Sequence, residues 1–475
     1  MSFCRPHSQA IPPAWPPCRV KELIFVDPNV FREYDIRGIV GSEIRDRDVY
    51  LLGKTFGTYM VRQGKSRVVV GRDCRLSSDR FRDLLVEGML ETELDIVDLG
   101  VCPTPLLYFA LHHLKREGGV MITASHNPPE YNGFKICNGV DTISGAEIQR
   151  IRELMESRDF AGGRGEIRQF AIQEPYIDYV LQSVRPKRSL RIGLDAGNAT
   201  GGPVALPLLR DLGCRVYPLY CEMDGTFPNH EPDPTVMENM RDIQELVVKE
   251  NLDVGIALDG DCDRLGVIDH RGEVVFGDKL MILFAREILS RRPGSLFISE
   301  VKCSKTLYDD IERNGGRAIM WKAGHSLIKA KMREVDAVLA GEMSGHVFFK
   351  DRYFGFDDGI YSACRLIEIL AATGKTIPEL LEGVPPTFST PEIRIPCPDD
   401  IKFEVVEQAR RSFAEKQFRI IDVDGARIVF PDGWGLVRAS NTQPVLVLRY
   451  EADSPERLDA IRNLVEGTLH AIMNR

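Results

Sequence analysis

An acidic run follows one strongly apolar segment of the chain. In DVGIALDGDCDR, the apolar stretch leads directly into Asp259, Asp261 and Asp263, followed by Arg264. Three carboxylates that converge at the end of a buried strand repel one another unless a hard cation compensates their charge. An EF-hand does not fit, because its sixth position would be Arg264 in place of glycine and its twelfth His270 in place of glutamate. Oxygen ligands favour Mg²⁺ over zinc or copper, so the run predicts a magnesium site.

A serine stands at the end of a second apolar segment. The residues GGVMITA predict a strand that ends in TASHNP, from Thr123 to Pro128. Ligands of open α/β sheets collect at the carboxyl ends of the strands, which makes Ser125 a candidate nucleophile beside His126. Taken alone, a strand exit with a helix-capping serine is the simpler interpretation. The G-x-S-x-G pattern of a nucleophile elbow is absent.

Two further polar segments have side chains suited to a phosphorylated sugar. GEMSGH (341–346) offers a carboxylate and a hydroxyl between glycines, groups that can bind sugar hydroxyls. RASNTQP (438–444) joins an arginine to Ser, Asn and Thr in a turn whose amides can form an anion-binding nest. YDIRG (34–38) and KAGHS (322–326) add an arginine, a lysine and a histidine. Each segment alone is explained as well by an ordinary polar turn.

The elements that must position these residues alternate regularly. From Ser66, apolar strands such as RVVVG and LDIVDLG are separated by amphipathic helices such as RFRDLLVEGML. This rhythm predicts right-handed βαβ crossovers and mostly parallel sheets. It restarts near SLRIGLDAG and again after a polar hairpin at Arg271 and Gly272, whereas the proline-rich stretch PTFSTPEIRIPCPDD introduces two helices and several short strands.

We therefore predict an α/β fold with three consecutive mixed α/β domains and a C-terminal α+β domain. A chain of 475 residues should hold about three or four domains of ~100–150 residues. The predicted division is a flexible N-terminal extension over 1–24, a serine-bearing domain over 25–170, a metal-binding domain over 171–273, a sugar-binding domain over 274–385 and a phosphate-binding domain over 386–475. The extension contains PPAWPP and no uninterrupted apolar stretch, so it does not resemble a signal peptide.

Composition limits the partners and the compartment. The formal charge of −9 argues against a nucleic-acid binder, and no apolar stretch approaches the ~18–20 residues of a membrane span. Eleven scattered cysteines without a C-x-x-C pair fit a reducing cytosol better than a zinc site or a disulfide framework. We expect a cytoplasmic protein whose partners are small molecules, not nucleic acid or membrane, and whose oligomeric state is open, with a monomer as one option.

Together the motifs resemble the α-D-phosphohexomutase superfamily, and within it the bacterial phosphomannomutase/phosphoglucomutase branch. The resemblance runs in order through YDIRG, TASHNP, NGFK, FPNHEPDP, DGDCDR, WKAGHS, GEMSGH and RASNT. It implies four domains around a central cleft. It also implies reversible phosphoryl transfer between C1 and C6 of mannose and glucose phosphates, through an enzyme phosphoserine and a hexose 1,6-bisphosphate. Mg²⁺ would be the cofactor, and hexose 1,6-bisphosphate the activator.

The resemblance also assigns roles to residues of this sequence. Ser125 is similar to the phosphorylated nucleophile, and its phosphate would complete a Mg²⁺ site formed by Asp259, Asp261 and Asp263. The remaining predicted catalytic residues are Arg37, His126, Lys135, Arg264 and His346. The predicted substrate-binding residues are Tyr34, Lys302, Lys322, His325, Glu342, Ser344, Arg438, Ser440, Asn441 and Thr442.

Two departures and three alternatives accompany this prediction. Cys262 replaces the second glycine of the family's DGDGDR, and Gln443 follows RASNT where threonine is more usual. A dehalogenase-type enzyme would instead phosphorylate an aspartate such as Asp259. A mutase for glucosamine phosphate is a second alternative, although Met343 favours mannose and glucose by resemblance. The third alternative is a catalytically silent sugar-phosphate sensor.

Overall fold

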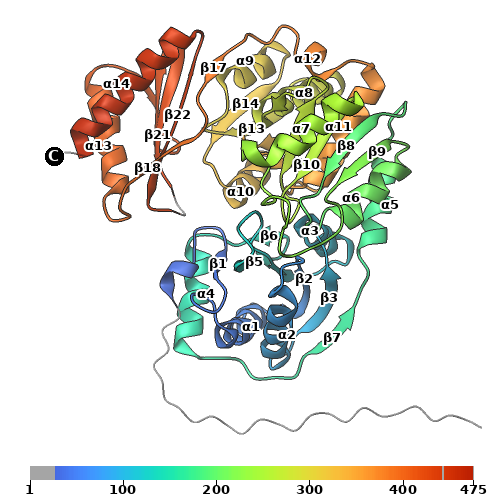
Figure 1. Cartoon of the computed structure of the whole chain (residues 1–475). Coiled ribbons are helices and arrows are strands. Elements are labelled where there is room, and N and C mark those ends of the chain that lie inside the picture. The colour runs from blue at the N-terminus through green and yellow to red at the C-terminus, as the bar shows by residue number, and fades with distance from the viewer. Residues whose placement is uncertain (1–26, 441–442, 474–475) are drawn as a thin grey trace, which may run out of the picture.

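The structure is a computed structural model that describes residues 27–440 and 443–473. Four sheets follow one another along the chain, each with its own helices, and we call the corresponding parts the first to fourth domains (Figure 1). The predicted α/β fold class with a C-terminal α+β domain is confirmed. The expected N-terminal extension lies outside the described residues. Within the described part of the chain, no helix is both long and apolar enough to span a membrane.

The first domain contains a seven-stranded sheet in the order β1-β5-β4-β2-β3-β7, with β6 paired to β5. The pairs β2/β3, β2/β4 and β3/β7 are parallel, whereas β5 runs antiparallel to β1, β4 and β6. Its elements are η1 (Pro28–Val30), β1 (Ile36–Ile39), α1 (Asp46–Val61), β2 (Arg67–Arg72), α2 (Ser78–Leu90), β3 (Asp95–Val101), α3 (Thr104–His113), β4 (Gly118–Ile122), β5 (Tyr131–Asn138), β6 (Asp141–Thr142), α4 (Ala146–Ser157) and β7 (Glu166–Gln169).

The second domain has a five-stranded sheet in the order β12-β11-β10-β8-β9. Its strands β10, β8 and β9 are parallel, and β11 returns antiparallel to β10. The elements are α5 (Gln173–Ser183), β8 (Arg191–Asp195), α6 (Gly202–Asp211), β9 (Arg215–Leu219), η2 (Met237–Met240), α7 (Arg241–Glu250), β10 (Val254–Leu258), β11 (Leu265–Asp269) and β12 (Val274–Val275).

The third domain repeats this plan with a four-stranded sheet in the order β14-β13-β15-β16. Strand β13 is parallel to β14 and β15, and β16 returns antiparallel to β15. The elements are α8 (Gly277–Arg291), β13 (Leu296–Glu300), α9 (Lys305–Arg313), β14 (Arg317–Trp321), α10 (His325–Val335), β15 (Leu339–Gly341), β16 (Val347–Phe349), α11 (Gly359–Thr373) and α12 (Ile377–Leu380).

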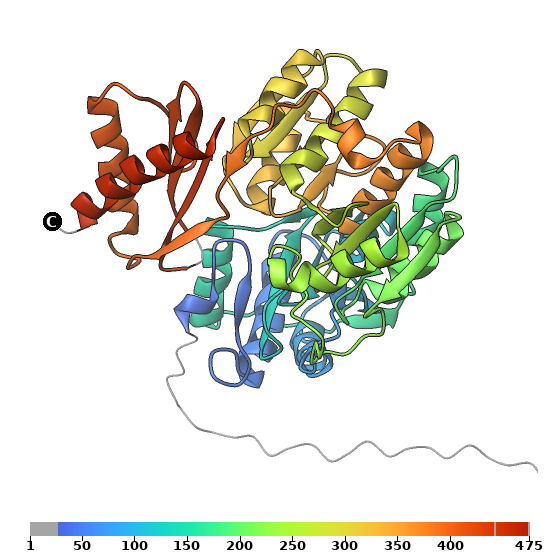
Figure 2. The same cartoon turned by 45° about the horizontal axis from the view of Figure 1, so that its top comes forward.

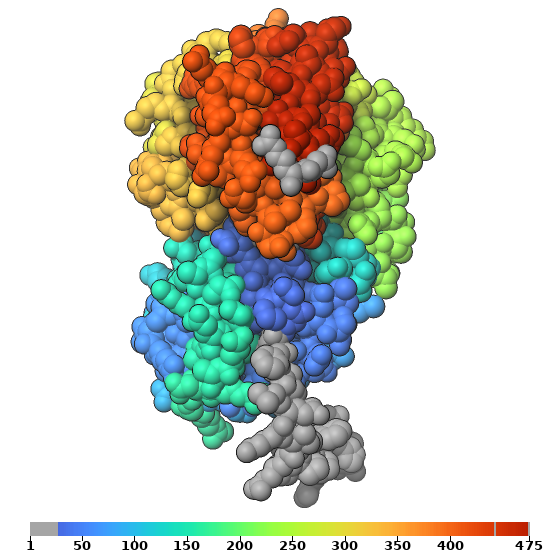
Figure 3. Space-filling model, turned by 90° about the vertical axis from the view of Figure 1, so that its left-hand side faces the viewer, coloured from blue at the N-terminus to red at the C-terminus, as the bar shows by residue number. Residues whose placement is uncertain are grey.

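The fourth domain is an antiparallel sheet of six strands with two long helices. It comprises β17 (Phe388–Ser389), β18 (Ile393–Pro396), α13 (Lys402–Glu415), β19 (Arg419–Ile421), β20 (Ala426–Phe430), β21 (Gly433–Ala439), β22 (Val445–Ala452) and α14 (Pro455–Met473). Its core is separate, whereas one continuous apolar cluster extends from Val69 to Ile377 through the other three domains. In Figures 2 and 3 the fourth domain lies beside the third domain and above the first.

The motif loops of the first three domains occupy equivalent places. Each connects a central strand to its antiparallel neighbour: β4 to β5, β10 to β11 and β15 to β16. The predicted mostly parallel sheets are therefore mixed, because an antiparallel strand follows each of these three loops. The returning strand brings the two ends of each loop together, and thereby holds the motif side chains on a short, tight connection.

Candidate active site

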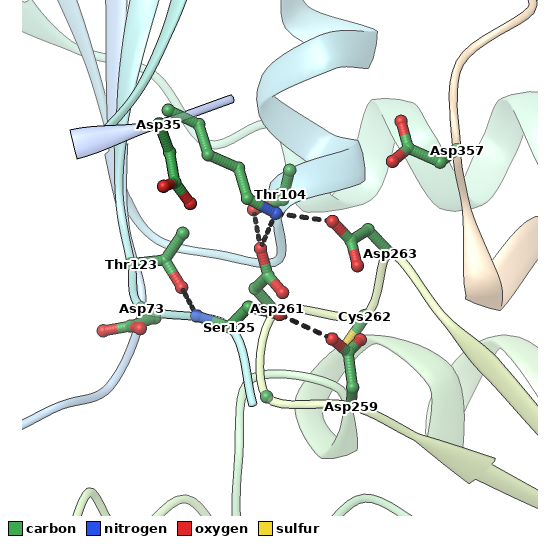
Figure 4. Close-up of polar contacts among 12 residues, drawn as sticks. Asp35, Asp73, Thr104, Thr123, Ser125, Asp259, Asp261, Cys262, Asp263 and Asp357 are labelled. Atoms are coloured by element: carbon green, nitrogen blue, oxygen red, sulfur yellow. Dashed lines mark hydrogen bonds and ion pairs between the residues drawn. The ribbon is translucent and has the colours of Figure 1, made fainter. Parts of the chain in front are cut away.

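Ser125 lies just beyond the end of β4 and is almost fully buried. Its backbone adopts the left-handed conformation, with φ of 52°, which L-residues rarely adopt. The side chain of Thr123 accepts a hydrogen bond from the Ser125 N–H at 2.9 Å. The Ser125 hydroxyl lies 2.8 Å from Asp259 Oδ2 (Figure 4). It also lies 3.1 Å from His126 Nδ1. The serine is thus held by the first domain and faces a carboxylate of the second.

Residues 259–264, which carry the three aspartates, form the aspartate loop, and residues 125–130 form the serine loop. The two loops approach each other closely because of a glycine. A Cβ on Gly260 would lie 2.2 Å from the Ser125 carbonyl oxygen, so no larger residue fits without movement. Cys262, two residues further on, is buried and has φ of 62°. That conformation is the one glycine adopts most easily, so Cys262 occupies a position that a glycine would fit with less strain. Asp259, Asp261 and Asp263 alternate with Gly260 and Cys262 along this loop.

The three aspartates have the chemistry of a hard-cation site. One oxygen from each of them lies within 4.8 Å of the others, and all three side chains are buried. Asp261 Oδ1 and Asp263 Oδ1 have no hydrogen-bond partner among the described residues. Burial and the charges of Asp263 and Asp261 raise the pKa of Asp259 well above its usual value. Unpaired buried carboxylate oxygens fit a divalent cation that prefers oxygen ligands, which supports the predicted metal ligands.

Lys135 contributes the nearest positive charge. Its ammonium group contacts Asp261 Oδ2 at 2.6 Å and Asp263 Oδ2 at 2.5 Å. Burial opposes this charge, but Asp261 and Asp263 outweigh burial and raise the pKa of Lys135. Thr104, at the start of α3, also donates to Asp261 Oδ2 at 2.5 Å. The cluster therefore combines one buried ammonium with three buried carboxylates, and a net negative charge remains to attract a cation.

His346 connects the aspartate loop to the third domain. Arg264 Nε lies 3.0 Å from His346 Nε2, and because a guanidinium only donates, this imidazole nitrogen accepts. The ring proton is therefore on Nδ1, which lies 3.2 Å from Asp357 Oδ2 and 3.5 Å from Asp263 Oδ1. Asp357 also pairs with Lys329 at 3.0 Å. The carboxylate of Asp357 thus lies within ion-pair distance of both His346 and Lys329.

Two more predicted residues border the serine. Arg37 donates to Asn127 Oδ1 at 2.5 Å and pairs with Asp35, so its guanidinium lies beside the serine loop. Burial and the cations Arg264 and Arg37 lower the pKa of His126 well below its usual value. The neutral imidazole of His126 and the guanidinium groups of Arg37 and Arg264 consequently lie near Ser125. This arrangement gathers positive charge locally in an acidic protein.

The sugar-binding prediction concerns a neighbouring group. Glu342 accepts a hydrogen bond from the Gly324 N–H at 2.6 Å, and the Ser344 hydroxyl lies 3.3 Å from its other oxygen. The rings of His325 and His346 stack at 5.7 Å, which joins this group to the aspartate cluster. Tyr34 of the first domain donates to the Ala323 carbonyl at 3.0 Å. The GEMSGH and KAGHS loops are therefore in contact, and Tyr34 contacts the KAGHS loop.

Lys322 precedes Ala323 in the chain, and its positive charge opposes the burial that raises the pKa of Glu33.

The fourth domain contributes a third group. Arg438 pairs with Asp424 at 3.0 Å, and the same Asp424 oxygen accepts from the Ala323 N–H at 3.0 Å. Lys302 pairs with Glu392 at 3.1 Å. The Ser440 hydroxyl accepts from the Gln443 N–H at 3.2 Å, which ties the ends of the RASNTQP turn. Asn441 and Thr442 lie outside the described residues.

Sequence reasoning missed several residues of these groups. Thr104 contacts the metal-ligand candidate Asp261, Asp357 lies 3.2 Å from His346, and Asp424 pairs with Arg438. The acidic pair at 357–358 before an apolar helix was the available signal for Asp357. Thr104 and Asp424 lie in ordinary capping and turn segments, whose sequences do not distinguish them from other turns.

Comparison with known proteins covers the same regions. Family models described as phosphoglucomutase/phosphomannomutase alpha/beta/alpha domains I, II and III match residues 28–162, 174–272 and 276–388, and the model of the C-terminal domain matches 392–467. A phosphomannomutase/phosphoglucomutase of Pseudomonas aeruginosa is 45% identical over 444 residues, which cover 94% of this chain and 96% of that protein. A phosphoglucomutase of Neisseria gonorrhoeae is 42% identical, with coverages of 94% and 98%.

A crystal structure agrees with these matches. The phosphoglucomutase/phosphomannomutase family protein of Burkholderia thailandensis superposes with a TM-score of 0.89 and 39% identity, over 94% of this chain and 98% of that one. The matches to all four domain models and the identities above 30% over nearly the whole length lead to one conclusion. The chain belongs to the phosphoglucomutase/phosphomannomutase family.

Proposed function

We propose that this phosphohexomutase transfers a phosphoryl group between C1 and C6 of mannose and glucose phosphates through a phosphoserine at Ser125. The observation that carries the proposal is the 2.8 Å contact between Ser125 Oγ and Asp259 Oδ2 in a buried cluster of carboxylates. Carboxylates alone would repel a phosphate on Ser125, so a phosphoserine here needs cations beside it to be stable and transferable. The three aspartates have the chemistry to hold such a cation, and the Lys135 ammonium lies 2.6 Å from Asp261.

The reaction consists of two phosphoryl transfers. In the first, the bond between phosphorus and Ser125 Oγ breaks, and a new bond forms to the free C1 or C6 hydroxyl. The hydroxyl gives its proton to a base, and the leaving Ser125 Oγ takes up a proton. The product is a hexose 1,6-bisphosphate. It turns around, and its other phosphate returns to Ser125, which releases the isomeric monophosphate. A bisphosphate that escapes leaves an inactive dephosphoenzyme, so added hexose 1,6-bisphosphate should activate the protein.

Charge around the serine would favour this transfer. Mg²⁺ held by Asp259, Asp261, Asp263 and the Ser125 phosphate would neutralise charge on the transferring group. Lys135, Arg264 and Arg37 supply further positive charge. His126, 3.1 Å from Ser125 Oγ, would exchange a proton with the reacting oxygens, and His346 would hold Arg264 through its Nε2. Phosphoryl transfer depends mainly on such positioning and charge stabilisation.

The other groups would hold the remainder of the substrate. Glu342 and Ser344 would bind sugar hydroxyls, with Tyr34 and His325 beside them. Arg438, Ser440, Asn441 and Thr442 would clamp the phosphate that does not react, assisted by Lys302 and Lys322. Two of these cations form ion pairs with carboxylates: Arg438 with Asp424, and Lys302 with Glu392. The substrate phosphate would compete with Asp424 and Glu392 for these cations.

We propose dual specificity because the sugar contacts proposed for Glu342 and Ser344 are to hydroxyls that glucose and mannose share, whereas the two sugars differ at C2. A site rejects an epimer strongly only when one of its own buried polar groups is left unpaired. Specificity constants for the two substrates should therefore lie within about two orders of magnitude, or roughly 3 kcal/mol. Glu342→Gln should weaken both by similar factors.

The test compares glucose 1-phosphate, mannose 1-phosphate and glucosamine 1-phosphate side by side, with Mg²⁺ and glucose 1,6-bisphosphate present. Turnover of the first two at comparable rates supports the proposal. If glucosamine phosphate is turned over faster than both, the protein is a mutase of different specificity. Binding of all three without turnover would support the sugar-phosphate sensor instead. A cytoplasmic location stays a prediction.

A further inference from the structure

The serine loop has an unusual demand for hydrogen-bond donors. Residues 125–130 follow β4 in turns and bends before β5 begins at Tyr131. The Pro128 and Glu130 carbonyls accept from the backbone N–H groups of Tyr131 and Val40, but among the described residues no backbone N–H donates to the carbonyls of Ser125 and Asn127. A buried carbonyl without a donor destabilises the fold, so such a loop needs donors from elsewhere. The left-handed Ser125 adds strain that its surroundings must hold in place.

One arginine supplies these donors. The guanidinium of Arg75 donates from one terminal nitrogen to the carbonyls of Ser125 and Asn127, at 2.8 and 2.6 Å. It donates from the other to the carbonyls of Pro128 and Tyr131, at 2.6 and 3.1 Å. Its Nε–H donates to Asp73 Oδ2 at 3.1 Å. An arginine has five N–H donors, and all five of Arg75 are used.

Arg75 is itself held from both domains. Its side chain has 0% exposure, and Asp73 also accepts from the Arg75 backbone and from the Ser78 hydroxyl. The ring of Phe227, from the second domain, lies 5.1 Å from the guanidinium carbon. Backbone bridging between Arg75 and Gly225 joins the two domains at this point. The serine loop, Arg75 and the second domain therefore form one packed unit.

We propose that Arg75 is a positioning residue for phosphoryl transfer, holding the Ser125 loop in register with the aspartate loop. The proposal rests on the proposed function of Ser125. The guanidinium binds the back of the loop, which leaves the Ser125 hydroxyl directed at Asp259. A lysine keeps the charge but has only three donors on a single nitrogen, so it cannot bind four carbonyls and Asp73 together. The loop would then leave the geometry that in-line transfer requires.

The test compares Arg75→Lys with Arg365→Lys. Arg365 is a matched control, because its side chain is also buried and donates to the Asp351 carbonyl, Tyr361, Glu287 and Asp351 in the third domain. Measurements are the phosphate bound per Ser125, kcat and KM for glucose 1-phosphate, and the melting temperature. Both variants should lose stability. Only Arg75→Lys should lose about 100-fold or more in kcat, with KM within about threefold of wild type.

Three results decide the matter. If folded Arg75→Lys keeps kcat within about threefold of wild type, Arg75 does not position the serine. Equal losses of kcat in both variants would likewise overturn the proposal, because they would reflect stability alone. If Arg75→Lys does not fold, Asp73→Asn replaces it; this variant keeps the arginine but weakens its anchor, and its kcat should fall by about tenfold, whereas an unchanged kcat contradicts the proposal. Failure of the proposed function would show differently, as wild-type protein without phosphate on Ser125.

Discussion

Ser125 Oγ lies 2.8 Å from Asp259 Oδ2, although the two residues are 134 positions apart in the chain. The contact joins the loop after β4 in the first domain to the loop after β10 in the second. Both loops connect a central strand to an antiparallel neighbour, and Gly260 permits their close approach. The candidate active site therefore depends on how two domains meet, and several consequences can be measured.

The first prediction concerns the close contact between the two loops at Gly260. Gly260→Ala places a methyl group 2.2 Å from the Ser125 carbonyl oxygen, so the two loops must separate. A displacement near 1 Å at a reacting group can cost about 100-fold in rate, and we expect a loss of that order in kcat. Gly162→Ala is the control, because a Cβ there meets nothing within 4 Å and should leave kcat unchanged. Normal kcat in Gly260→Ala would show that the loops need not approach so closely.

The second prediction concerns the metal. Asp261→Asn keeps the shape of the side chain but removes one anionic ligand, and hard-cation affinity depends on ligand charge. The Mg²⁺ concentration for half-maximal activity should rise by about tenfold or more, and turnover should fall strongly. Asp195→Asn, also buried at a strand end of the same sheet, should leave the Mg²⁺ requirement unchanged. Full activity of wild-type protein after exhaustive chelation would contradict the metal site.

These positions illustrate what the sequence could predict. The strand that ends at Leu258 and the run that begins at Asp259 were clear, because apolar and acidic residues meet abruptly there. The alternation of helices and strands predicted the α/β class and its restarts. It did not predict the antiparallel returns β5, β11 and β16, because a short apolar strand after a polar loop has the same pattern in either direction.

The partners of three residues could not be predicted from the sequence for a different reason. Thr104 contacts Asp261 of the second domain, Arg75 contacts Ser125 across the first domain, and Asp357 lies beside His346 within the third. The segments of Thr104 and Arg75 resemble ordinary helix starts and turns, and tertiary packing alone determines which residues they contact. The family resemblance supplied the roles of Glu342 and Arg438, which periodicity and spacing alone left open.

The third prediction concerns the phosphate clamp. Arg438→Lys keeps the positive charge but loses the planar pair of donors suited to phosphate. KM should rise by about tenfold for both glucose and mannose phosphates, equivalent to about 1.4 kcal/mol, with a smaller change in kcat. Arg410→Lys, on α13 and far less buried, should leave both constants unchanged. An effect on only one of the two sugars would indicate that Arg438 recognises the sugar and not the phosphate.

The fourth prediction concerns pH and stability. His230 pairs with Asp195 at 3.0 Å; burial opposes its charge, but this partner prevails and raises the pKa of His230 above its usual value of 6.5. A raised pKa means that the folded protein binds the proton more tightly, so the pair stabilises fully below pH 6.5 and loses this effect as pH rises through the folded pKa. His230→Asn should therefore lower the melting temperature more at pH 6 than at pH 9. An equal decrease at both pH values would contradict the ion pair.

The central claim is that Ser125 carries the phosphate. The most direct measurement is to charge the protein with ³²P-labelled glucose 1,6-bisphosphate, map the labelled peptide and expose it to hydroxylamine. We predict one label on the peptide that contains Ser125, stable to acid and to hydroxylamine, and no label in Ser125→Ala. A hydroxylamine-labile label on Asp259 would contradict the account and support a dehalogenase-type acyl phosphate.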